Sequence, residues 1–188
     1  MHELPPIRMY RKNLDRSFYR INRFLFRALK VACSGVVPWP LTLMSGKGVG
    51  KTCACLFYCD VTRGSLYATH RSFTSDLHLV RTGGLADPVT GKRITEEQFW
   101  KRVVDFRLVV IDDVLMGKAA TPLAVDTLMQ IIRYRTFKPL ILITSLRPSE
   151  IRREFGDNVL AALCEGTPVV VSEQTYHPGK TVNKNEKT

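Results

Sequence analysis

The chain has 188 residues, of which 45% are hydrophobic and 24% are charged, so it is long enough for one compact domain with a buried core. This composition excludes disorder throughout, and no apolar run approaches the roughly 18 residues that a membrane span needs. The 28 Lys and Arg against 17 Asp and Glu give a net charge of +11, which favours a polyanionic partner, nucleic acid first, over a basic enzyme without one.

The five cysteines form no CxxC pair and no metal-ligand spacing. They are typical of small apolar residues in a reducing compartment. Because there is also no signal peptide, we expect a cytoplasmic protein with no membrane partner.

The first predicted element is an amphipathic helix over residues 14–30. Its apolar and basic side chains recur at helical spacing about two positions out of phase, which gives one apolar and one cationic face. Eight basic and two acidic side chains give the first forty residues a charge of +6. The candidate nucleic-acid-binding residues are Arg16, Arg20, Arg23, Arg27 and Lys30. A solvated helix face and a membrane-surface helix are the alternatives.

Beyond residue 40 the pattern predicts strands that alternate with helices. The strands are predicted at residues 41–44, 65–69, 108–111, 140–144 and 168–171. The helices are predicted at residues 50–62, 72–80, 95–104 and 121–136, with a short one from 148. This alternation predicts a three-layer α/β fold with a five-stranded parallel sheet. The chain is divided into a basic segment at 1–38, a core at 39–175 and a flexible polar tail at 176–188.

The stretch MSGKGVGKT, residues 44–52, lies between the first predicted strand and the following helix. In a phosphate-binding loop, backbone N–H groups and a helix N-terminus converge on phosphate, a lysine neutralises charge and a hydroxyl holds Mg²⁺. The usual first glycine is replaced by Ser45, which is small enough for that backbone. The predicted nucleotide-binding residues are Ser45, Gly46, Lys47, Gly48, Val49, Gly50, Lys51 and Thr52.

A hydrophobic run that ends in two carboxylates, residues 108–113, supplies the second motif. Asp112 is expected to hold Mg²⁺ through a water, and Asp113 to polarise the attacking water, because phosphoryl transfer depends on positioning and charge compensation. The predicted strand 65–69 lies between the loop strand and the carboxylate strand, as in ATPases that move another macromolecule. Ser145, or its neighbour Thr144, is expected to contact the lytic water, with a plain strand-terminal turn as the alternative.

Four motifs in this order, IDD, IIRY, KPLILITS and IRREFGD, resemble the DnaC-type helicase loaders and the IstB-type transposition ATPases, which are AAA+ proteins close to the DnaA initiator. The resemblance covers about residues 14–173. It implies an ATP-dependent switch that contacts single-stranded DNA and a replicative helicase or a transposase, with ATP between neighbouring subunits. By position, Lys51 and Thr52 take the Walker A roles, Asp112 and Asp113 the Walker B roles, and Ser145 the sensor role.

The chain departs from the family in three ways. The sensor is typically Asn, and the Ser-Arg pair that supplies a trans-acting arginine is replaced by Ala161 and Ala162. Only about 40 residues precede the loop, so no separate N-terminal domain is expected, and little or no C-terminal helical lid. Loss of an arginine finger would leave slow hydrolysis or require a partner's arginine. The candidate substitutes are Arg152, Arg153, Arg133 and Arg135, each with solvated or packing roles as the alternative.

The leading hypothesis is a minimal AAA+ ATPase of DNA replication, which binds ATP and Mg²⁺, self-associates with ATP and contacts single-stranded DNA, a replicative helicase or both. One alternative is an ATP-binding DNA adaptor with little hydrolysis of its own. Others are a DNA-packaging or phage-assembly ATPase and a P-loop kinase.

Overall fold

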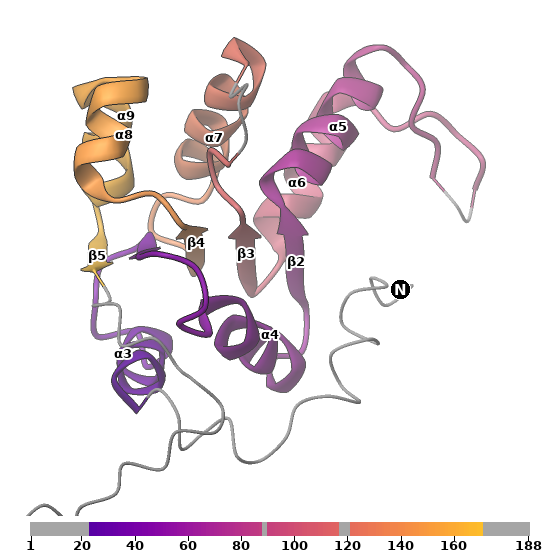
Figure 1. Cartoon of the computed structure of the whole chain (residues 1–188). Helices are drawn as coiled ribbons and strands as arrows, with labels where there is room; N and C mark the ends of the chain where they lie inside the picture. Colours follow the sequence, from indigo (N-terminus) through magenta and orange to yellow (C-terminus); the bar gives the residue numbers. More distant parts are fainter. Residues whose placement is uncertain (1–22, 88–89, 117–120, 171–188) are drawn as a thin grey trace, which may run out of the picture.

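A single parallel sheet organises the described residues of the computed structural model, which are 23–87, 90–116 and 121–170 (Figure 1). Its strands are β1 (Leu41–Met44), β2 (Ser65–Thr69), β3 (Leu108–Asp112), β4 (Leu140–Thr144) and β5 (Thr167–Val170). They are hydrogen-bonded in the order β2-β3-β4-β1-β5, every pair parallel. The predicted five-stranded parallel sheet is therefore confirmed.

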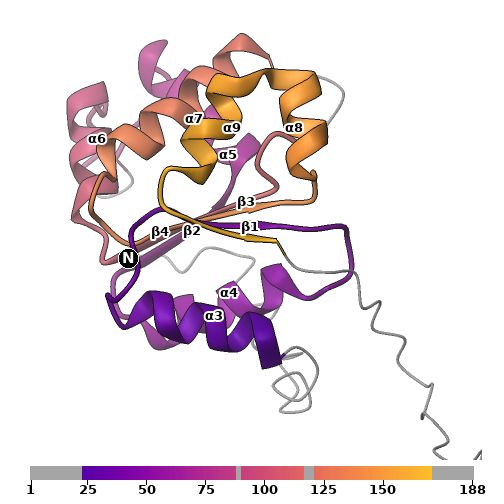
Figure 2. The ribbon, with the colours of Figure 1, turned by 90° about the vertical axis from the view of Figure 1, so that its left-hand side faces the viewer.

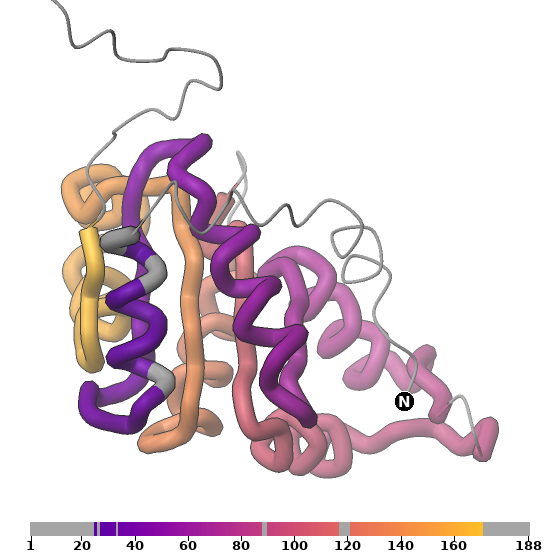
Figure 3. Tube along the Cα trace, turned by 90° about the horizontal axis from the view of Figure 1, so that it is seen from below, coloured from indigo at the N-terminus to yellow at the C-terminus, as the bar shows by residue number. Residues whose placement is uncertain are grey.

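Helices cover both faces of the sheet. They are α3 (Arg23–Cys33), α4 (Lys51–Val61), α5 (His70–Arg81), α6 (Glu96–Asp105), α7 (Pro122–Tyr134), α8 (Pro148–Phe155) and α9 (Asp157–Cys164). Seen along the sheet, α3 and α4 lie on one side and α5 to α9 on the other (Figure 2). The view from below shows α3 and α4 next to each other on the near side (Figure 3). No helix in the described part is both long and apolar enough to span a bilayer.

The strands build two cores because successive side chains point to opposite faces. Leu43 in β1 and Ile141 in β4 belong to the core under α3 and α4. Leu140 and Leu142 in β4 belong to the core under α5 to α9. The central strands β1, β3 and β4 are buried at every position, as the continuous apolar runs predicted.

The position of β2 in the sheet corrects one prediction. The strand between β1 and β3 is β4, whereas β2 is the outermost strand beside β3. The two differ in burial, since every residue of β4 is buried and only Tyr67 is buried in β2. Chain order placed β2 in the middle wrongly, because the long connection after β3 lets β4 enter the sheet between the strands already formed.

Several helix ends follow the predicted chemistry. Thr95 and Gln98 form a reciprocal capping box at the start of α6, and Thr121 caps α7 before Pro122. The helix predicted over 72–80 starts two residues earlier, because Thr69 caps it through Ser72 N. A separate helix α9 was not predicted among the elements, and Gly156 at φ 86° turns the chain into it from α8.

Arg135, just after α7, is buried in the core. Its Nη1 donates to the carbonyl oxygens of Val103 (3.2 Å), Val104 (3.1 Å) and Phe106 (2.8 Å), and Nη2 donates to Pro139 O (2.5 Å). These acceptors lie at the end of α6 and just before β4. Val104 O also accepts from Lys138 Nζ (3.0 Å), and Pro139 O also accepts from Val109 N (3.1 Å). Burial lowers the pKa of Arg135 to about 10, so it stays charged at neutral pH. Its candidacy as an arginine finger is therefore wrong.

Replacing Arg135 with Met is expected to lower the free energy of unfolding by about 2–4 kcal/mol, because four buried hydrogen bonds from a charged donor are lost. Urea denaturation followed by circular dichroism measures this. The matched control is Arg133→Met, two positions earlier and exposed, which should cost less than about 0.5 kcal/mol. Equal losses in the two variants would contradict the structural role of Arg135.

Candidate functional site

The first part of the site is the loop between β1 and α4. Gly48 (φ 87°) and Gly50 (φ 84°) adopt the left-handed backbone that favours glycine. Val49 between them is buried in the core under α3 and α4, so it anchors the loop. The loop borders a cavity of about 440 Å³, whose walls also include Asp112 and Ser145. This volume suits a small-molecule ligand.

The Lys51 side chain lies inside the loop. Its Nζ donates to Ser45 O (2.8 Å), Ser45 Oγ (3.0 Å) and Gly46 O (2.8 Å). Burial lowers the pKa of Lys51, and the carboxylates of Asp112 and Asp113 oppose that shift. Ser45 therefore does not obstruct the loop, because its hydroxyl is one of the acceptors of the lysine. A phosphate oxygen that binds Lys51 would share or replace these acceptors.

Asp112 joins three elements at the bottom of the cavity. Its Oδ2 accepts from Thr52 Oγ1 (2.7 Å) and from Tyr67 OH (2.7 Å), and its Oδ1 accepts from Asp113 N (2.7 Å). The carboxylate is buried, so these donors compensate for its lost hydration. Thr52 and Asp112, the two predicted Mg²⁺ ligands, are thus brought into direct contact.

Tyr67 is the residue of the site that the sequence did not identify. Its ring is buried in the core, and its hydroxyl donates to Asp112. In the register, Tyr67 lies opposite Val110, and Asp112 is two residues further along β3 on the same face. A long side chain reaches such a diagonal neighbour. Aligning the two predicted strands with period two would have indicated the contact.

Asp113 occupies an exposed position on a turn with a left-handed backbone (φ 54°). Burial, and secondarily the charge of Asp112, raises the pKa of Asp113, while Lys47 and Lys51 oppose that shift. Its carboxylate makes no hydrogen bond to another described side chain or backbone group. Asp113 is thus available to a water molecule, with more basicity than an ordinary aspartate.

The turn that follows Asp113 is held from two sides. Val114 N donates to Ile143 O (2.8 Å), and Thr144 Oγ1 donates to Val114 O (2.9 Å). Leu115, also left-handed at φ 59°, donates its N–H to His70 Nδ1 (3.3 Å). Surrounding contacts of this kind are needed to hold non-glycine residues at positive φ.

The two candidate sensor residues have different surroundings. Thr144 is buried, donates to Val114 O and accepts from Leu146 N (3.1 Å), so its hydroxyl has a structural role in the turn. Ser145 lines the cavity together with Asp113. Of the two, Ser145 is the one placed toward a nucleotide, and its sensor role stays a prediction.

The remaining candidate arginines lie on the surface. Arg152 Nε pairs with Asp157 Oδ1 and Arg153 Nη2 with Glu154 Oε1, at 2.8 and 2.9 Å. Arg133 is exposed on α7. None of the three lines the cavity, so only a neighbouring subunit could receive them, and the arginine-finger role stays a prediction.

Part of the basic amphipathic helix is described. In α3, Leu25 and Leu29 are buried under the sheet, while Arg27 and Lys30 are exposed. Arg16, Arg20 and the side chain of Arg23 lie outside the described residues. The described part therefore has the predicted division into an apolar and a cationic face.

The comparisons with solved structures find replication proteins. DnaA from Aquifex aeolicus with AMPPCP bound matches at TM-score 0.60 and 19% identity, over 84% of this chain and 51% of that one. A replication initiator DnaA bound to AMPPCP and single-stranded DNA matches at TM-score 0.61 and 19% identity, over 80% and 46%. A DnaC helicase loader matches at TM-score 0.56 and 18% identity, over 84% of this chain and all of that one.

The chain spans about half the length of the DnaA chains that it matches. No family model matches the sequence, and neither does any curated protein. At these identities the likeness shows the fold. The chain therefore has a three-layer α/β fold like that of these DnaA and DnaC structures.

Proposed function

We propose that the protein binds and hydrolyses ATP with Mg²⁺ and acts in DNA replication as a minimal, helicase-loader-like AAA+ ATPase. The observation that carries this proposal is the direct contact of Thr52 with Asp112 in the wall of the cavity, next to Lys51 in its glycine loop. The structural likeness to initiators and to a helicase loader supports the replication role.

In this proposal the side chains divide the work of phosphoryl transfer. Lys51 would neutralise phosphate charge, and Thr52 and Asp112 would hold Mg²⁺, which would supply further positive charge to stabilise the phosphates in the reaction. Among the described residues, no group of three or more His, Cys, Asp or Glu side chains could bind a metal alone. Phosphate oxygens and water would therefore complete the coordination, as Mg²⁺ prefers. Asp113 would orient the attacking water, and Ser145 would contact it.

The second candidate is an ATP-binding adaptor with little hydrolysis of its own. Ala161 and Ala162, which match the positions of the family's Ser-Arg pair, lie on α9 and carry no guanidinium. If no surface arginine replaces that pair, turnover would be slow unless a partner supplies one. Measurement of ATP turnover separates the two candidates, because tight ATP binding without turnover would favour the adaptor.

The proposed partners are single-stranded DNA, a replicative helicase or both, together with further copies of this chain in the presence of ATP. One structural neighbour was solved with single-stranded DNA and another is a helicase loader. The exposed Arg27 and Lys30 of α3 supply a described part of the basic surface for DNA.

ATP turnover by the purified protein, alone and with single-stranded or duplex DNA, is the primary test. Lys51→Ala is expected to weaken ATP binding at least about tenfold, because the phosphate charge loses its cation. Asp113→Asn is expected to keep binding and lose turnover by about 10² or more. Turnover that survives in Asp113→Asn would refute the hydrolysis role of Asp113, and tight binding without turnover in the unaltered protein would favour the adaptor.

Tyr67→Phe removes the hydroxyl that donates to Asp112 and keeps the buried ring. The concentration of Mg²⁺ needed for half-maximal turnover is expected to rise about three- to tenfold, because Asp112 Oδ2 loses one of the two donors that orient it and keeps only Thr52. Titration of Mg²⁺ at saturating ATP measures it. Tyr134→Phe, an exposed tyrosine on α7, is the matched control and should leave the titration unchanged. An equal effect of both variants would contradict the proposed role of the hydroxyl.

Binding to a fluorescent single-stranded oligonucleotide should weaken as salt concentration rises. Replacing Arg27 and Lys30 with Ala is expected to flatten the slope of log affinity against log salt by roughly 1.4, or about 0.7 for each lost phosphate contact. The control replaces Arg152 and Arg153, which are paired with acidic neighbours, and removes the same charge. If both double variants give the same slope, the basic face of α3 does not contact DNA.

A further inference from the structure

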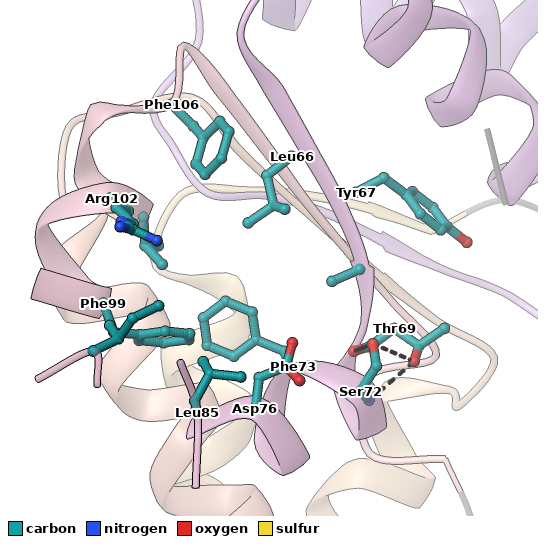
Figure 4. A pocket seen from close by; sticks show the side chains of 13 residues that line it. Leu66, Tyr67, Thr69, Ser72, Phe73, Asp76, Leu85, Phe99, Arg102 and Phe106 are labelled. Carbon is teal, nitrogen blue, oxygen red and sulfur yellow. Dashed lines mark hydrogen bonds between the residues drawn. The ribbon is translucent and has the colours of Figure 1, made fainter. Parts of the chain in front are cut away.

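A second cavity, of about 480 Å³, lies at the outer edge of the sheet and shares no lining residue with the nucleotide cavity (Figure 4). Its walls include three phenylalanines, two leucines, an isoleucine and a valine. Figure 4 shows Leu66 directed into the cavity and Tyr67 directed away from it. The apolar side chains that line the cavity include Leu66 and Ala68 of β2, Phe73 of α5, Phe99 and Val103 of α6, and Phe106. The cavity is therefore apolar and separate from the candidate active site.

The floor of this cavity is the edge strand of the sheet. β2 pairs with β3 on one side, and no other strand among the described residues pairs with it. The outward backbone N–H and C=O groups of an edge strand form a template for a further strand. The template and the apolar cavity thus lie together on β2, and the side chains of Leu66 and Ala68 connect them.

The rim of the cavity carries one uncompensated charge. Asp76 of α5 lies beside Phe73 in Figure 4, and no hydrogen bond or ion pair joins its carboxylate to another described residue. Partial burial raises the pKa of Asp76. The cation at the rim, Arg102, is already paired with Asp87. The rim therefore favours a cationic group and disfavours the phosphates of a nucleic acid.

We infer that the cavity and the outer edge of β2, with which no other described strand pairs, together bind an extended segment of a partner protein. The segment adds to β2 as a strand, inserts one large apolar side chain against Phe73, Phe99 and Phe106, and places a Lys or Arg beside Asp76. Backbone hydrogen bonds supply affinity in such strand addition, and a pocket for alternate side chains supplies specificity. Because side chains two residues apart share a face, the basic residue belongs two positions from the apolar one. This site goes beyond the proposed function and does not depend on it.

The test uses the full chain and a fluorescein-labelled peptide, Thr-Val-Thr-Phe-Thr-Lys-Thr, in fluorescence anisotropy. Saturable binding with a Kd below about 1 mM is expected. Replacing Phe by Ser in the peptide, or Ala68 by Trp in the protein to fill the cavity, should weaken binding at least about tenfold. Circular dichroism and ATP binding report whether Ala68→Trp is folded.

Asp76→Asn provides an independent measurement on an exposed side chain. Replacing Lys by Gln in the peptide should weaken its binding to the unaltered protein about two- to fivefold and should have no effect on Asp76→Asn. The matched control is Glu97→Gln, an exposed carboxylate of α6 that does not line the cavity, which should bind the Lys peptide as the unaltered protein does.

Three outcomes would overturn the inference. The first is no binding up to 1 mM, or binding that neither Ala68→Trp nor Asp76→Asn changes. The second is displacement of the probe by an unlabelled peptide with the sequence of residues 1–22, which would assign the site to this chain's own segment. The third is displacement by a single-stranded oligonucleotide. Failure of ATP binding or turnover would leave the peptide result standing, so the two proposals fail separately.

Discussion

The candidate active site depends on the buried carboxylate of Asp112. Its three hydrogen bonds come from the first turn of α4, from β2 and from the turn after β3. A buried charge without such donors would be strongly destabilising. Moving any of the three donors away from the carboxylate would therefore cost stability. Because β2 takes part, the outermost strand of the sheet helps to position a group at the carboxyl end of its neighbour β3.

The proximity of motifs that directly follow strands was predictable from sequence. In a parallel α/β sheet the carboxyl ends of the strands meet at one edge, so a glycine loop after one strand and two aspartates after another had to lie close together. The loop glycines, Lys51, Thr52 and Asp112 are gathered there in the structure. The position of each motif directly after a predicted strand was enough to predict that these residues lie together.

Features that depend on the order of strands and on packing were not predictable in the same way. Chain order placed the strand 65–69 in the middle of the sheet, whereas it lies at the edge. The bond from Tyr67 to Asp112 requires the register of β2 against β3. Arg135 was a candidate arginine finger with a solvated or packing role as the alternative, and its buried packing role depends on the end of α6 and the residue before β4, which surround it only in the folded chain. Local sequence patterns do not indicate which segments far apart in the chain will contact each other.

The imidazole of His70 links the turn after Asp113 to helix α7. Because its Nδ1 accepts from Leu115 N, its Nε2 carries the proton that is donated to Ala124 O (3.0 Å) in the first turn of α7. Burial lowers the pKa of His70, which favours this neutral form. A shift of the backbone after Asp113 would therefore pull on the start of α7. This ring gives the protein a direct connection from the turn after Asp113, at the cavity, to the start of α7.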